Sequence, residues 1–71
     1  MATIICGNRK NEVVKFAQEQ LGAIHKCYPS GNMGWEAKDL SDAQFRAAIV
    51  AQFGGESFPG SPHYCGEVRV D

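Results

Sequence analysis

The stretch AIHKCYPSGNMGWEAKDL, residues 23–40, predicts a β-hairpin, and the class of fold follows from it. Residues 23–28 are expected to form the first strand of the hairpin, and residues 33–40 the second. The four residues PSGN between them are all types that favour turns. Two strands joined by so short a turn are expected to pair antiparallel.

The second hairpin strand separates apolar from charged side chains. Successive side chains of a strand point to opposite faces, so Met33, Trp35 and Ala37 share one face. Glu36 and Lys38 take the other face. Burying an unpaired ion costs several kcal/mol. We therefore predict that Trp35 lies in the core and that Glu36 and Lys38 lie on an exposed face.

One helix is predicted on each side of the hairpin. Residues 9–21 repeat apolar side chains at spacings of three and four, with Asn8 as the expected N-cap and Gly22 as the expected stop. Ser41 and Gln44 have the spacing of a capping box and predict the start of the second helix. A pair of glycines is expected to end it.

Two further strands are predicted towards the ends of the chain. ATIIC, residues 2–6, is a short apolar run typical of a buried central strand. HYCGEVRVD, residues 63–71, alternates, which places Glu67 and Arg69 on an exposed face. GGESFPGSP, residues 54–62, is expected to be a long loop.

The predicted order of elements is strand, helix, strand, strand, helix, strand. This order indicates an α+β, ferredoxin-like fold: a four-stranded antiparallel sheet in the order 4-1-3-2, with two helices on one face. A three-stranded sheet with two helices is the alternative. The 71 residues are expected to form a single domain, residues 1–71.

Composition narrows the classes of function. The formal net charge is −1, from 7 basic and 8 acidic residues, whereas nucleic-acid binders usually carry a basic surplus. The apolar runs are too short to cross a membrane and no signal peptide is evident, so we expect a cytoplasmic protein without a membrane partner. Three cysteines, an odd number, argue against a disulfide framework.

The tripeptides HKC and HYC suggest paired metal ligands. They place His25 with Cys27, and His63 with Cys65. In the predicted sheet these pairs lie on opposite edges, roughly 14 Å apart at ~4.8 Å per strand. Zinc–ligand bonds are only about 2 Å long, so one ion cannot bind both pairs. The sequence therefore predicts no metal ion and no cofactor, with zinc binding as an alternative should the strand order differ.

Cys6 is a candidate reactive thiol. The residues GNRK that follow it place its sulfur near a helix N-terminus and two cations, which lower the pKa of a thiol. The predicted antiparallel last strand begins beside Cys6 and brings His63 and Cys65 towards it. A Cys–His dyad or a reversible Cys6–Cys65 disulfide is one hypothesis. Buried, inert cysteines are the favoured interpretation.

Three segments resemble RNA recognition motifs. TIICGN (3–8) is similar to their first-strand motif, GNMGWEAKDLSDAQFRAAI (31–49) to their third strand and second helix, and GEVRVD (66–71) to their last strand. The resemblance implies bases stacked on aromatic side chains of the first and third strands. The first strand has no aromatic residue here, and Trp35 is predicted in the core. RNA or single-stranded nucleic-acid binding is therefore an alternative function.

The favoured function is binding to another protein. An exposed face of mixed charge suits a protein better than a polyanion, and long loops with aromatic residues often form binding anchors. The residues expected to contact the partner are Glu36, Lys38, Phe58, Tyr64, Glu67 and Arg69.

The short chain has no room for an enclosed active site, so we expect a non-enzymatic inhibitor or adaptor that docks on a larger complex. In type it is similar to the small inhibitors encoded by phages and mobile elements, including anti-CRISPR proteins. An exposed edge strand is also expected to permit homodimers by sheet extension.

Overall fold

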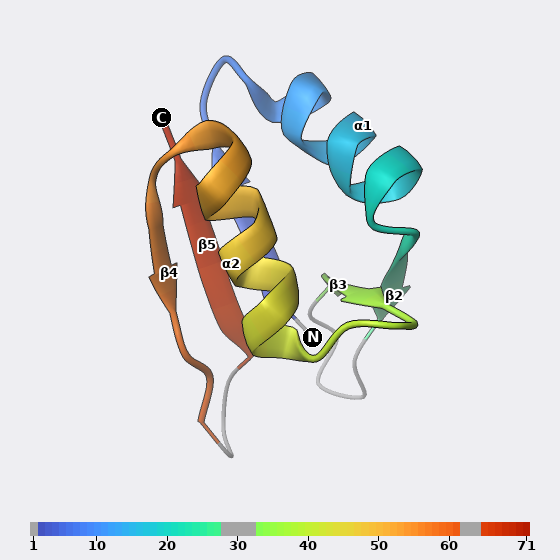
Figure 1. Cartoon of the computed structure of the whole chain (residues 1–71). Coiled ribbons are helices and arrows are strands. Elements are labelled where there is room, and N and C mark those ends of the chain that lie inside the picture. The colour runs from blue at the N-terminus through green and yellow to red at the C-terminus, as the bar shows by residue number, and fades with distance from the viewer. Residues whose placement is uncertain (1, 28–32, 62–64) are drawn as a thin grey trace.

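The described residues of the protein form a five-stranded sheet with two helices (Figure 1). The computed structural model describes residues 2–27, 33–61 and 65–71. The elements are β1 (Ala2–Cys6), α1 (Lys10–Gln20), β2 (Ala23–Cys27), β3 (Met33–Ala37), α2 (Asp42–Phe53), β4 (Glu56–Phe58) and β5 (Gly66–Val70). The turn predicted at residues 29–32 lies outside the described residues.

The sheet is mixed, with the strand order β2-β3-β1-β5-β4. Three neighbouring pairs are antiparallel: β2 with β3, β3 with β1, and β5 with β4. The central pair, β1 with β5, is parallel, and its register runs from Ala2↔Gly66 to Cys6↔Val70. The two chain segments that form this pair are therefore far apart in sequence and side by side in space.

The α+β class is confirmed, but the predicted four-stranded antiparallel sheet of ferredoxin-like order is wrong, as is the three-stranded alternative. The error lies in residues 54–62, which were expected to form a loop. They contain β4, which pairs with β5 through Glu56↔Arg69 and Phe58↔Glu67. Because this additional strand reverses the chain once more, β5 runs parallel to β1 instead of antiparallel.

The structure confirms the predicted start of α2 and contradicts the predicted start of α1. The capping box at the start of α2 is confirmed: the Gln44 amide donates to Ser41 Oγ (3.1 Å), and the Ser41 amide donates to Gln44 Oε1 (2.9 Å). The Asn8 cap is wrong, because the N-cap of α1 is Arg9 and makes no side-chain cap hydrogen bond. Gly22 adopts the positive φ of 65° that is typical after a helix end.

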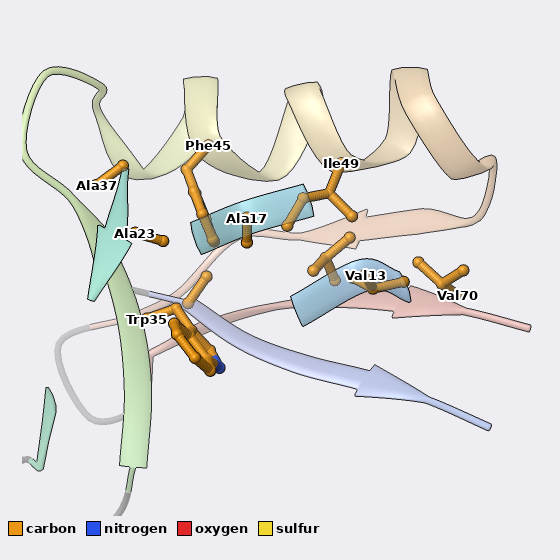
Figure 2. Packing of buried hydrophobic residues seen from close by; sticks show 10 residues of the cluster. Val13, Ala17, Ala23, Trp35, Ala37, Phe45, Ile49 and Val70 are labelled. Atoms are coloured by element: carbon orange, nitrogen blue, oxygen red, sulfur yellow. The ribbon is translucent and has the colours of Figure 1, made fainter. Parts of the chain in front are cut away.

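The core lies between the two helices and one face of the sheet (Figure 2). Its largest fully buried side chains are Phe45, Ile49, Val13 and Val68. Trp35 is only 9% exposed, which confirms its predicted place in the core. The ten buried apolar residues are Ala2, Val13, Ala17, Ala23, Trp35, Ala37, Phe45, Ile49, Val68 and Val70.

The opposite face of the sheet, which we call the open face, is not covered by a helix in the described chain. Strand alternation and the pairing register assign residues to it. It carries Thr3 and Ile5 of β1, Ile24 and Lys26 of β2, Gly34 and Glu36 of β3, Glu56 and Phe58 of β4, and Glu67 and Arg69 of β5.

Neither helix of the described residues is long and apolar enough to cross a bilayer. The helix α1 has 11 residues and α2 has 12, whereas a membrane span needs about 20.

Candidate docking site on the open face

Large apolar side chains are exposed across the whole width of the open face. Ile5 on the central strand is 43% exposed, Ile24 on the β2 edge 54%, and Phe58 on the β4 edge 37%. Side chains of these types are usually inside a protein, and burying one completely stabilises by about 1.5–3 kcal/mol. The open face therefore offers apolar surface that a partner can cover.

Four of the five charged residues on the open face form two ion pairs within it, and Glu56 is the fifth. Lys26 Nζ lies 3.1 Å from Glu36 Oε2, and Arg69 Nε lies 3.1 Å from Glu67 Oε2. Exposed pairs of this kind contribute little to stability. They do neutralise the face locally, so a partner that covers it meets few charges without a counter-ion.

Three of the residues predicted to contact a partner meet at the β4–β5 pair. Phe58 lies opposite Glu67, and the Arg69 guanidinium lies 5.4 Å from the centre of the Phe58 ring. Glu36 lies on the same face, on β3. Lys38 is exposed but belongs to the turn after β3. Phe58 is therefore presented by a strand rather than by the predicted loop.

A shallow pocket of about 470 Å³ lies at this end of the open face, and it is lined by Thr3, Phe58, Pro59, Cys65 and Glu67. A hydrogen bond joins Thr3 Oγ1 to Cys65 Sγ (3.2 Å). Apolar walls with a few polar groups are typical of pockets that receive a side chain or a small ligand. Tyr64 and His63 lie outside the described residues.

Arg46 holds β4 in place from the helix side. It is only 9% exposed, and its Nε donates to Asp42 Oδ2 (2.9 Å) while Nη1 donates to Ser57 Oγ (2.6 Å). Ser57 points to the helices, so its neighbours Glu56 and Phe58 point to the open face. Sequence reasoning missed Arg46, although its spacing of four from Asp42 was a usable signal.

Of the two His-Cys tripeptides, the structure describes His25, Lys26 and Cys27 of the first and Cys65 of the second. His25 on β2 stacks on Trp35, with ring centres 4.4 Å apart and planes inclined by 6°. Cys27 is exposed on the same strand, and two strands separate β2 from β5. In the described part of the chain, no three acidic, histidine or cysteine residues form a group that could hold a metal ion.

The structure does not bring Cys6 and Cys65 together. Cys6 pairs with Val70 at one end of β1, whereas Cys65 precedes Gly66, which pairs with Ala2 at the other end. Four strand residues separate these ends, or about 13 Å. This separation does not support the hypothesis of a Cys6–Cys65 disulfide, because β5 runs in the opposite direction to the one expected.

The surroundings of Cys6 do not favour the thiolate that the hypothesis of a reactive thiol requires. Its side chain packs against the core, and burial raises the pKa of the thiol, an effect that the positive charge of Lys10 only partly offsets. The direction of this shift agrees with the favoured interpretation of a buried, inert cysteine.

We expect iodoacetamide at neutral pH to modify Cys6 more slowly than the exposed Cys27, because the Cys6 thiolate is disfavoured. Peptide mass spectrometry over a time course measures both rates, and Cys6→Ser confirms the assignment. The pKa of Cys6 is higher in the folded chain than in the unfolded chain, so the thiol ionises first in the unfolded chain as the pH rises past about 8.5. The free energy of unfolding should therefore fall above that pH. Modification of Cys6 ahead of Cys27 would contradict the structure.

No protein-family model matches the chain, and no curated protein or solved structure does either.

Proposed function

We propose that the protein is a non-enzymatic binding module that docks on a larger protein partner through its open face, as an inhibitor or adaptor. The observation that carries this proposal is the exposure of Ile5, Ile24 and Phe58 on one face of one sheet. The three side chains lie on alternate strands of the sheet, β2, β1 and β4, so a partner that spans the open face can contact all of them.

The chemistry of the open face favours a protein partner over a nucleic acid. Lys26 and Arg69 are each paired with a glutamate of the same face, so little positive charge is left for phosphates. On the open face, β1 presents Thr3 and Ile5, and neither stacks on a base as an aromatic ring does. The one tryptophan of the chain faces the core.

Phe58 is the expected anchor of the contact. It lines the pocket, and the Arg69 guanidinium lies over its ring. Aromatic residues and arginine next to pockets are frequent hot spots, where truncation costs about 2 kcal/mol or more. A few such residues dominate the affinity of most interfaces.

We expect Phe58→Ala to weaken partner binding about 30-fold and Ile5→Lys to abolish stable capture, because both remove apolar contact at the open face. The measurement is affinity capture from the source cell with nuclease-treated lysate, followed by titration of the captured protein. Gln18→Lys, on the exposed side of α1, is the matched control and should bind as the unmodified chain does.

Circular dichroism should show that all three variants keep the fold. A partner that binds Phe58→Ala and Ile5→Lys as tightly as the unmodified chain would exclude the open face. Capture of RNA or single-stranded DNA with a steep salt dependence would instead support the nucleic-acid alternative.

A further inference from the structure

The two edge strands of the sheet lie on opposite sides of the molecule and differ in their protection (Figure 1). The edge strand β4 has only three residues and is followed by Pro59, which lacks an N–H. Short length and proline both prevent a further strand from pairing. The edge strand β2 has five residues and no proline, and its only charged residue, Lys26, is paired with Glu36. The β2 edge therefore lacks these protections.

We infer that β2 pairs antiparallel with β2 of a second copy of this chain, about a two-fold axis at His25. The two sheets then form one continuous ten-stranded sheet. In this register His25 meets His25 of the second copy, and Ile24 meets Lys26 of the second copy. This inference goes beyond the proposed function and does not depend on it.

The charges of β2 fit a second copy. A two-fold axis at His25 sets no lysine opposite a lysine, because each Lys26 faces the apolar Ile24 of the other chain. The four-carbon stem of Lys26 can cover Ile24, which is 54% exposed, while its ammonium stays 3.1 Å from its own Glu36. With a net charge of −1 per chain, two copies repel only weakly.

The helix side of the β2 edge adds apolar surface to the same contact. The helix α1 packs over β1 and β2, whereas α2 packs over β5, β3, β4 and β1. Phe16 of α1 contacts Phe53 of α2, so that flank of α1 faces α2. Val14 lies about 160° around the helix from Phe16, on the opposite flank, and it packs partly against the core of its own chain. The exposed part of this flank is available to a second copy.

Charged substitutions at Ile24 test this register, because a given charge should have opposite effects on the stability of one chain and on the affinity of the dimer. Within one chain Ile24 lies opposite Glu36, so Ile24→Lys gains an attraction and Ile24→Glu a repulsion. Across the axis the same position faces Lys26, so Ile24→Lys gains a repulsion and Ile24→Glu an attraction. A change in dimerisation is thereby separated from a change in protomer stability.

The experiment is sedimentation equilibrium of the full chain from micromolar to millimolar concentration. We expect a dimer of twice the mass of one chain. The dissociation constant of Ile24→Lys should be about tenfold larger, because the new side chain faces Lys26 of the second copy twice, once on each side of the axis. Ile24→Glu should dimerise at least as tightly as the unmodified chain. Ile5→Lys, the same change on a central strand, should leave the dimer intact.

Three results would overturn the inference. A monomer at all concentrations would exclude the dimer. A dimer broken by Ile5→Lys but not by Ile24→Lys would mean that two open faces meet instead of two edges. A dimer weakened more by Ile24→Glu than by Ile24→Lys would exclude the register.

Discussion

Replacing Gly55 with alanine is expected to lower the free energy of unfolding by about 3 kcal/mol, because both strain and overlap follow from the added Cβ. Gly55 has a φ of 114°, which side-chain-bearing residues rarely adopt. A Cβ there would overlap the carbonyl oxygen of Arg69 and lie 3.3 Å from Val70 Cα. These are backbone atoms of β5, which is paired on both sides and cannot withdraw.

The substitution should loosen β4 more than the rest of the sheet. Gly55 directly precedes β4, so relief of the overlap would move Glu56–Phe58 away from β5. Hydrogen exchange of β4 amides should therefore accelerate more than that of β1 amides, and urea unfolding gives the loss of stability. Because a domain of this size has only about 5 kcal/mol of stability, the variant should be close to unfolding at physiological temperature.

The neighbouring Gly54 provides the control. It also has a positive φ, of 74°, but a Cβ there would meet nothing within 4 Å. Gly54→Ala should cost less than Gly55→Ala, about 2 kcal/mol, because a φ of 74° with a ψ of 179° is a backbone conformation that strains a side-chain-bearing residue, but no overlap adds to that strain. Equal losses of stability in the two variants would show that β4 does not approach β5 as closely as the structure indicates.

The same glycines show what the sequence could reveal. A glycine pair after an apolar helix predicts the end of that helix, and Gly54 is the C-cap of α2. The strand that follows was not recognised, because ESF is short and is enclosed by glycine and proline. Its strand geometry comes from pairing with β5, a contact that residue patterns do not encode locally.

One missed strand had consequences elsewhere. Without β4, the last strand was expected antiparallel to β1, which placed Cys65 beside Cys6. With β4 present, β5 runs parallel to β1 and the two thiols lie at opposite ends of it. Strand direction depends on the number of reversals in the chain, so one missed strand exchanges the two ends of β5 but leaves the faces of its side chains unchanged.

The sequence predicted charged residues of the open face, but it did not predict that Ile5 is exposed there. Alternation placed Glu36, Glu67 and Arg69 on the open face, where the structure has them. Ile5 was read as buried, because a run of apolar residues normally indicates burial on both faces of a strand. The strand β1 is central, but helices cover only one of its faces, so Ile5 is exposed.

The second large effect is expected from Arg46→Ala, which should lower the free energy of unfolding by about 3 kcal/mol. The substitution removes the donor to Asp42 Oδ2 and the donor to Ser57 Oγ together, and both contacts are part-buried. A group left without its partner in such a place costs more than the intact pair contributes. Chemical denaturation measures the loss.

Arg69→Ala is the matched control, because Arg69 also pairs with a carboxylate, at 3.1 Å, but on the exposed face. It should cost less than about 1 kcal/mol. Arg46→Met keeps most of the apolar stem and separates lost packing from lost hydrogen bonds. If Arg46→Ala and Arg69→Ala destabilise equally, Arg46 does not occupy the buried position that the structure gives it.

The Arg46 variants also connect stability with the proposed function. Arg46 lies on the helix side of the sheet and does not reach the open face, yet through Ser57 it sets the position of β4 and hence of Phe58. Arg46→Met should therefore weaken partner binding while leaving Ile5 and Ile24 in place. A double-mutant cycle with Ser57→Ala should show coupling in stability and in binding. Independent effects of the two substitutions would mean that Phe58 is positioned by its pairing with β5 alone.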